Sequence, residues 1–142
     1  MKDLLNLASE LMANDAYKSD NYVERKPDGQ YPVNIDSIEL KTSQKGTQWF
    51  RFKTTILDGE YAEEYFTVDW FLTEKTMERT IKNIMKLITS CGFELSTEMF
   101  TSYETLEECL QALLNQQVVL TKKTSKNDFI NYSLLGGVSY VD

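Results

Sequence analysis

The stretch of residues 28–59, DGQYPVNIDSIELKTSQKGTQWFRFKTTILDG, decides the fold of this chain. Its later part, WFRFKTTIL at 49–57, alternates side chains between two faces with the two-residue period of a β-strand. Its earlier part changes phase, because Val33 and Ile35 share one parity whereas Ile38 has the other. One inserted residue moves all later side chains to the opposite face of a strand. The phase change therefore predicts a β-bulge or a strong bend inside one long strand.

The rest of the chain predicts further strands and helices around this stretch. A run at 60–72 alternates again and indicates a third strand after the Asp58-Gly59 turn. Later segments carry apolar residues at intervals of three and four, as amphipathic helices do. The expected order is a helix at 3–13, three strands within 30–73, helices at 73–93 and 101–114, and strands at 116–123 and 129–140.

This order predicts a mainly β protein of the α+β class. Three strands, a helical connection and a final hairpin are the pattern of the OB fold, a five-stranded barrel that binds oligonucleotides. We expect an N-terminal helix and arm at residues 1–26 and one OB-fold-like barrel at residues 27–142, with a two-helix insert before the fourth strand. A chain of 142 residues suits one such domain.

The composition excludes several functions. The chain has 15 Lys+Arg, 22 Asp+Glu and no His, which gives a net charge of −7. Without His, a Ser-His-Asp triad, a histidine metal ligand and an imidazole base are excluded. The two Cys residues form no CxxC motif, so we expect no zinc site, no other metal and no cofactor. These observations favour a binding protein that is not an enzyme.

The hydropathy of the chain predicts where in the cell the protein is found. No apolar run approaches the ~20 residues that span a bilayer. The first 20 residues carry acids among their apolar side chains and lack the apolar core of a signal peptide. We expect a cytoplasmic protein that does not bind membranes. The negative net charge opposes attraction to nucleic acid as a whole, so any such binding requires a local basic surface.

The basic residues are concentrated in two windows that contain no acid. These windows are 41–53 and 120–126. In an OB-like barrel the first covers the loop before the second strand and that strand, and the second is the loop between the last two strands. We expect both windows to converge on one face. Their cations are Lys41, Lys45, Arg51, Lys53, Lys122, Lys123 and Lys126.

Aromatic residues accompany the first window. Trp49 shares its strand face with Arg51 and Lys53. An aromatic ring between cations suits a single strand, because bases stack on the ring while cations neutralise phosphates. Further candidate platforms are Tyr65, Phe71, Phe129 and Tyr132. The alternative for each ring is an ordinary place in the core.

The same stretch resembles the small phage-encoded single-stranded DNA-binding proteins of the OB-fold type. The matching residues are Asp28, Gly29, Tyr31, Val33, Ile35, Lys41, Thr42 or Ser43, and Gly46. The resemblance covers roughly residues 28–92 and, less specifically, the final hairpin. It implies sequence-independent binding of single-stranded DNA in phage replication or recombination, in the host cytoplasm and without catalysis. It also implies replication or recombination proteins as partners. The sequence leaves open DNA against RNA, and whether the N-terminal arm supports a homodimer.

Two other functions remain as alternatives. The acidic runs at 58–64 and 94–108 suit an interaction protein or a DNA mimic that inhibits a host protein, with carboxylates in place of phosphates. Pro27-Asp28 and Glu39-x-Lys41 match the pattern of a Mg-dependent nuclease, in which the two acids would hold the metal ion. The nuclease pattern is permissive, because Asp28-Gly29 is more typical of a turn and Glu39 of an outward-facing strand position.

Overall fold

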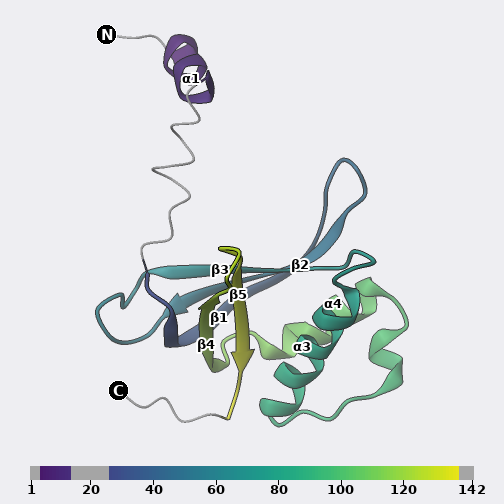
Figure 1. Cartoon of the computed structure of the whole chain (residues 1–142). Coiled ribbons are helices and arrows are strands. Elements are labelled where there is room, and N and C mark those ends of the chain that lie inside the picture. Colours follow the sequence, from purple (N-terminus) through teal and green to yellow (C-terminus); the bar gives the residue numbers. More distant parts are fainter. Residues whose placement is uncertain (1–3, 14–25, 138–142) are drawn as a thin grey trace.

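The computed structural model describes residues 4–13 and 26–137, and Figure 1 shows how the elements are arranged. The first helix, predicted at 3–13, is present, whereas most of the predicted arm and the end of the predicted last strand lie outside the described residues. The elements are α1 (Leu4–Ala13), β1 (Gly29–Thr42), β2 (Gln48–Ile56), β3 (Tyr65–Phe71), α3 (Met77–Ser90), the 3-10 helix η1 (Thr97–Phe100), α4 (Tyr103–Leu110), the 3-10 helix η2 (Gln111–Leu113), β4 (Gln117–Thr124) and β5 (Ile130–Leu135).

The five strands form one antiparallel sheet in the order β3-β2-β1-β4-β5. The long strand β1 is central because it pairs with β2 on one side and with β4 on the other. Its register shifts between Ile35 and Ser37, so Ile35 lies opposite Thr54 while Ile38 lies opposite Phe52. The predicted bulge is thereby confirmed. It keeps apolar side chains from both halves of β1 on the same face of the sheet.

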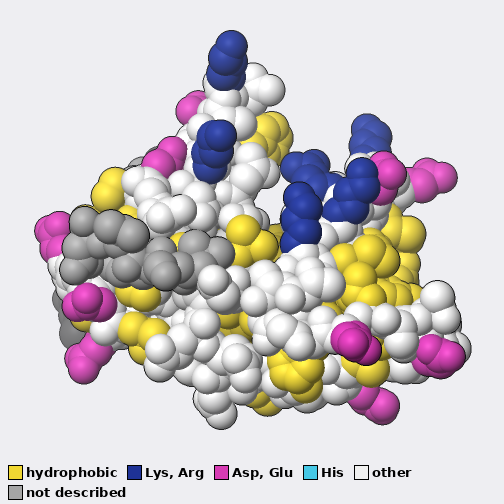
Figure 2. Space-filling model, turned by 90° about the horizontal axis from the view of Figure 1, so that it is seen from below, with side chains coloured by type: hydrophobic (Ala, Val, Ile, Leu, Met, Phe, Trp, Pro, Cys, Tyr) yellow, Lys and Arg dark blue, Asp and Glu magenta, His cyan; other side chains and the backbone are white. Residues whose placement is uncertain are grey.

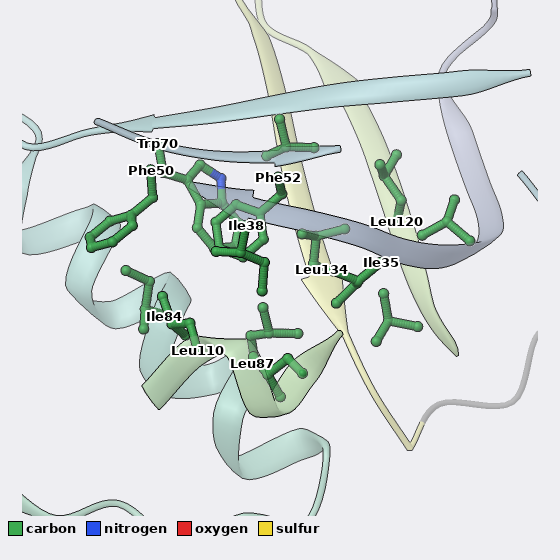
Figure 3. Close-up of a cluster of buried hydrophobic side chains, with 14 of the residues drawn as sticks. Ile35, Ile38, Phe50, Phe52, Trp70, Ile84, Leu87, Leu110, Leu120 and Leu134 are labelled. Carbon is green, nitrogen blue, oxygen red and sulfur yellow. The ribbon is translucent and has the colours of Figure 1, made fainter. Parts of the chain in front are cut away.

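The core lies between this face and the helices (Figure 3). Phe50, Phe52 and Trp70 extend from β2 and β3 toward Ile84 of α3 and Leu110 of α4. In α3 the buried apolar residues recur at helical spacing, so one side of the helix packs inward and the other meets solvent. Burial of these side chains supplies most of the driving force for folding. In Figure 1 both α3 and α4 lie below β2 and β3, on the core side of the sheet.

The sheet is not closed into a barrel by backbone pairing, because β3 and β5 remain its edges. The two edges nevertheless meet through side chains. Trp70 Nε1 of β3 donates to the Tyr132 carbonyl of β5 at 3.2 Å, and the rings of Phe66 and Tyr132 lie 5.6 Å apart. The mainly β, α+β class is therefore confirmed, whereas the predicted barrel is an open and strongly bent sheet.

The helices of the described part of the chain are too short or too polar to cross a membrane.

Helix α3 begins at Met77, because a turn at 73–76 precedes it and Thr76 Oγ1 donates to the Phe71 carbonyl. The helix predicted from residue 73 therefore begins four residues later than expected, with Thr76 at its N-cap position and no side-chain cap hydrogen bond. Ser102 caps α4, since its hydroxyl accepts a hydrogen bond from Thr105 N at 3.0 Å.

Candidate nucleic-acid interface

The outer face of β1, β2 and β3 carries an aromatic pair. Trp49 of β2 lies opposite Lys41 of β1 and Phe71 of β3, so these three form one row across the strands. The rings of Trp49 and Phe71 lie 5.4 Å apart at an angle of 33°. Trp49 is half-buried and Phe71 is 39% exposed. The pair is therefore an aromatic surface on the sheet and is separate from the core.

The packing fixes the orientation of the tryptophan. Its Nε1 is buried and has no hydrogen-bond partner among the described residues. The guanidinium of Arg51 lies 5.8 Å from the centre of the Trp49 ring, at the distance of a cation–π contact. Because Nε1 is buried, the indole ring of Trp49 offers no polar atom to solvent, so any contact that a ligand makes with this ring is apolar.

The next row along the sheet contains an ion pair. Arg51 lies between Glu39 and Asp69, and its Nε and Nη2 donate to the two Asp69 oxygens at 2.8 and 3.1 Å. This hydrogen bonding raises the pKa of Arg51. A bidentate pair of this kind holds the guanidinium in place beside the aromatic pair. It also neutralises most of the charge that Arg51 was predicted to offer to phosphates.

The other two lysines on these strands differ in whether an acid neutralises their charge. Lys41 Nζ lies 2.7 Å from Glu39 Oε2, and this contact holds the pKa of Glu39 below its ordinary value. Lys53 is exposed and lies one row further, opposite Ser37 and Thr67. The charge of Lys53 is therefore exposed to solvent, whereas the charge of Lys41 is neutralised by Glu39.

The loop between β1 and β2 adds an exposed cation. Ser43 N donates to the Thr47 carbonyl at 2.8 Å, and Gly46 adopts a φ of +86°, which favours glycine. This tight turn presents Lys45 to solvent. Beside it lies a shallow pocket of about 220 Å³, lined by Lys45, Gly46, Thr47, Gln48, Leu72 and Thr73. The first window, together with Phe71 of β3, therefore supplies a compact surface with two rings and two cations that no acid neutralises, Lys45 and Lys53.

The lysines of the second window, residues 120–126, differ in burial. Lys122 is only 5% exposed, and its ammonium donates to the Lys26 carbonyl. It shares the parity of the buried Leu120, so the prediction that Lys122 contacts phosphate does not fit its burial. Lys123 and Lys126 are exposed, and Phe129 is 69% exposed in the loop between β4 and β5.

Other predicted aromatic residues do not join the Trp49 pair. Tyr65 is 71% exposed, but it begins β3 while Phe71 ends it. Tyr65 and Phe71 are six residues apart along the strand, a distance of roughly 20 Å. Tyr132 belongs to the contact between the sheet edges. The structure thus brings Lys41, Trp49 and Phe71 together, with Arg51, Lys53 and Lys45 nearby, and leaves Tyr65, Phe129 and the exposed lysines of the second window elsewhere.

The two acids of the nuclease pattern do not form a metal site. Asp28 precedes β1 and accepts hydrogen bonds from Thr124 N and Oγ1 at 2.9 and 2.8 Å. Glu39 lies near the other end of β1, where it pairs with Lys41. About ten residues of strand place the two carboxylates roughly 30 Å apart, too far to share one ion. Within residues 4–13 and 26–137 no cluster of three acidic or sulfur ligands occurs.

One basic surface was missed by the sequence reasoning. The turn before α3 and the helix itself carry Lys75, Arg79, Lys82 and Lys86, all exposed. Their separations of four, three and four residues are a helical repeat that the sequence already contained. The windows 41–53 and 120–126 stand out in the sequence because they lack acids, whereas α3 also contains Glu78.

A protein family described as "Protein of unknown function (DUF669)" matches residues 13–134. Because this match covers most of the chain, the protein belongs to that family. No curated protein matches the chain. The family name assigns no activity, so the inference of function rests on the geometry of the surfaces described above.

Proposed function

We propose that this protein binds single-stranded nucleic acid, DNA in the first place, without strong sequence preference, on the outer face of β1, β2 and β3. The observation that carries this proposal is the Trp49–Phe71 pair, two partly exposed rings 5.4 Å apart on a sheet face with cations beside them. Rings of this kind accept any base, because every base has a π face.

The energetics suit a single strand better than a duplex. A base stacked on an aromatic side chain contributes about 1–3 kcal/mol, and the bases of a duplex are already stacked on each other. Lys45 and Lys53 lie on the two sides of the ring pair along β2 and its preceding loop. They would neutralise phosphates of a strand that crosses the sheet, so a chain of net charge −7 still offers a local basic surface.

The strand order supports a more specific interpretation. A five-stranded antiparallel sheet with β1 central and its edges in side-chain contact is compatible with an OB fold opened between β3 and β5. OB folds bind oligonucleotides on the face of strands 2 and 3. With the resemblance of residues 28–59 to phage proteins, we propose a role in phage DNA replication or recombination, in the host cytoplasm.

Tryptophan fluorescence tests this function directly. Trp49 is half-buried on the outer face, whereas Trp70 is 6% exposed and hydrogen-bonded in the core. An oligo-dT of about 25 nucleotides should quench the emission of Trp49, at an affinity that falls with salt. A duplex of equal length should quench weakly. The variant Trp49→Phe should lose the quenching while keeping most of the binding in a gel mobility assay, because phenylalanine also stacks.

Either of two results would contradict the proposal. Quenching that persists in Trp49→Phe would place the bound strand near Trp70 and not on the outer face. The absence of both quenching and a mobility shift in the wild-type protein would remove nucleic acid as the ligand. In that case the acidic segments at 58–64 and 94–108 become the better guide, toward a protein target.

A further inference from the structure

Helix α3 presents a row of cations to solvent. Arg79, Lys82 and Lys86 lie within an arc of roughly 60° on the helix, because 3.6 residues complete one turn. The opposite side of α3 packs into the core through Ile84 and Leu87, both fully buried. The cations therefore lie on the exposed side of the helix, and they extend over about 10 Å of helix axis.

The β4–β5 hairpin lies beside this helix. Arg79 Nη1 is 3.5 Å from Asn131 Oδ1 of β5, and Gly136 N donates to Ser90 Oγ at the end of α3. The hairpin carries two exposed lysines, Lys123 near the end of β4 and Lys126 in the loop. Figure 2 shows Lys and Arg side chains gathered over α3 and over the projecting hairpin, with a recess between the two groups. Two segments distant in sequence thus form the walls of one basic groove.

These cations are far less neutralised than those of the sheet face. The one ion pair recorded for them in residues 26–137 joins Lys82 to Glu78 at 3.6 Å, with side chains 64% and 86% exposed. Such an exposed pair contributes little and leaves the lysine available. On the sheet face, by contrast, Arg51 and Lys41 each contact an acid within 2.8 Å. More of the positive charge at α3 and the hairpin is therefore free to attract a polyanion.

The groove is connected to the sheet face. The pocket beside Lys45 is also lined by Leu72 and Thr73, which lead from β3 toward α3. Leu72 N donates to the Gln48 carbonyl at 2.9 Å, so the β1–β2 loop and the start of this segment are joined. Lys75 follows two residues later and is exposed. A basic path thus runs from the loop to the helix.

We propose that α3 and the β4–β5 hairpin form a second basic groove that binds the phosphate backbone of the same single strand where it extends beyond the sheet face. This inference rests on the proposed function and adds a route for the strand. Phe129, 69% exposed in the hairpin loop near Lys126, would give a base a further ring on which to stack. A duplex or a folded acidic protein offers no unstacked base to that ring.

Oligonucleotide length separates the two surfaces. Fluorescence anisotropy of labelled oligo-dT of about 6 and about 25 nucleotides compares a strand that fills the sheet face with one that continues into the groove. In Lys82→Ala/Lys86→Ala we expect about tenfold weaker binding of the long strand and less than twofold for the short one. The salt slope with the long strand should fall by about 1.4, since each phosphate contact contributes about 0.7.

Two further variants make the result decisive. Lys82→Arg/Lys86→Arg keeps the charges and should keep the wild-type affinity for both lengths. Lys123→Ala/Lys126→Ala, on the opposite wall, should repeat the loss for the long strand only. All four positions are exposed, so circular dichroism and melting should match the wild type.

The outcomes distinguish the groove from the proposed function. Unchanged binding of the long strand by both alanine variants overturns the groove and leaves the sheet face intact as a binding site. Equal weakening of binding with both lengths also overturns the groove. The cations would then strengthen binding only through the overall charge of the protein and not through contacts with the longer strand. Absence of binding by the wild-type protein at either length contradicts the proposed function itself.

Discussion

The two faces of β2 and β3 place the same residue types in opposite roles. On the inner face Phe52 is fully buried, and its ring lies 4.8 Å from that of Trp70. On the outer face Trp49 and Phe71 form a similar pair, 5.4 Å apart, but Phe71 is 39% exposed. One residue along a strand therefore separates an aromatic ring that stabilises the fold from one that is available to a ligand.

The difference shows why aromatic content alone does not identify a binding surface. The inner indole satisfies its N–H with the Tyr132 carbonyl, and helices cover its ring. The outer indole has no such acceptor among the described residues, and charged side chains surround it. Removal of an inner ring should cost stability, whereas removal of an outer ring should cost binding.

The largest expected effect is on stability. Phe52→Ala should lower the free energy of unfolding by about 3–5 kcal/mol, because it leaves a cavity in the core. Phe71→Ala, the matched change on the outer face, should lower it by about 1 kcal/mol or less. Urea unfolding followed by circular dichroism measures both. Equal losses would mean that the outer pair is a second core, and the comparison of the two faces would fail.

The next effect is on affinity. Trp49→Ala should weaken binding of oligo-dT by about 1–3 kcal/mol, a loss of about fivefold or more, because one stacking platform is removed. A titration by gel mobility shift measures it without relying on tryptophan emission. Trp49→Phe is the control that keeps a ring. If the alanine variant binds as tightly as the phenylalanine variant, stacking at this position is absent.

A smaller effect in the opposite direction is expected at Asp69. Asp69→Asn removes the carboxylate that neutralises Arg51, so the guanidinium becomes available to a phosphate. Affinity for oligo-dT at low salt should rise about threefold, and the salt slope should increase by about 0.7. The loss of stability should stay below about 1 kcal/mol, because the pair is partly exposed.

The control for this change removes an acid away from the aromatic pair. Asp58→Asn changes the net charge equally in the exposed turn between β2 and β3. It should leave the salt slope as in the wild type. If both variants gain the same affinity, the gain reflects net charge and Arg51 is not a contact.

The smallest effect concerns pH and the hairpin that forms one wall of the basic groove. Hydrogen bonds from Thr124 N and Oγ1 hold the pKa of Asp28 below its ordinary value of 3.8. A depressed pKa means that the ionised form stabilises the fold above pH ~4, and that this contribution is lost as the pH falls through the lower folded value. Asp28→Asn should therefore be less stable than the wild type at pH 7.

The measurement compares thermal unfolding of both proteins between pH 7 and pH 2. The difference between them should shrink toward the acid end as Asp28 of the wild type becomes protonated. A difference that is constant with pH would show that the amide loses packing or geometry and that the charge of Asp28 contributes nothing.

Sequence patterns predicted the parts of the fold that depend on near neighbours. The phase change between Ile35 and Ile38 predicted the bulge correctly, because alternation is a local consequence of the pleat. Alternation likewise placed Trp49 and Arg51 together on the face opposite Phe50. The sequence did not show that Arg51 would be held by Asp69, which lies in the adjacent strand 18 residues away.

The second basic window shows where such patterns fail. Val118, Val119 and Leu120 are consecutive and all buried, so their hydropathy does not reveal which parity of β4 faces inward. The choice is made by pairing with β1, where Leu120 lies opposite Tyr31 and Lys122 opposite Gly29. Lys122 therefore enters the interior together with Leu120, although its neighbour Lys123 is exposed.

By itself the sequence determined the strands, the helices and the charge pattern of each element, because these follow from residue types a few positions apart. It determined the helical spacing of the cations of α3 in the same way. Only the tertiary structure decided that β3 and β5 remain edges, that Lys122 is buried and that α3 lies beside the β4–β5 hairpin. These outcomes depend on packing between segments that are distant along the chain, where burial of the shared core and not local periodicity selects the neighbour.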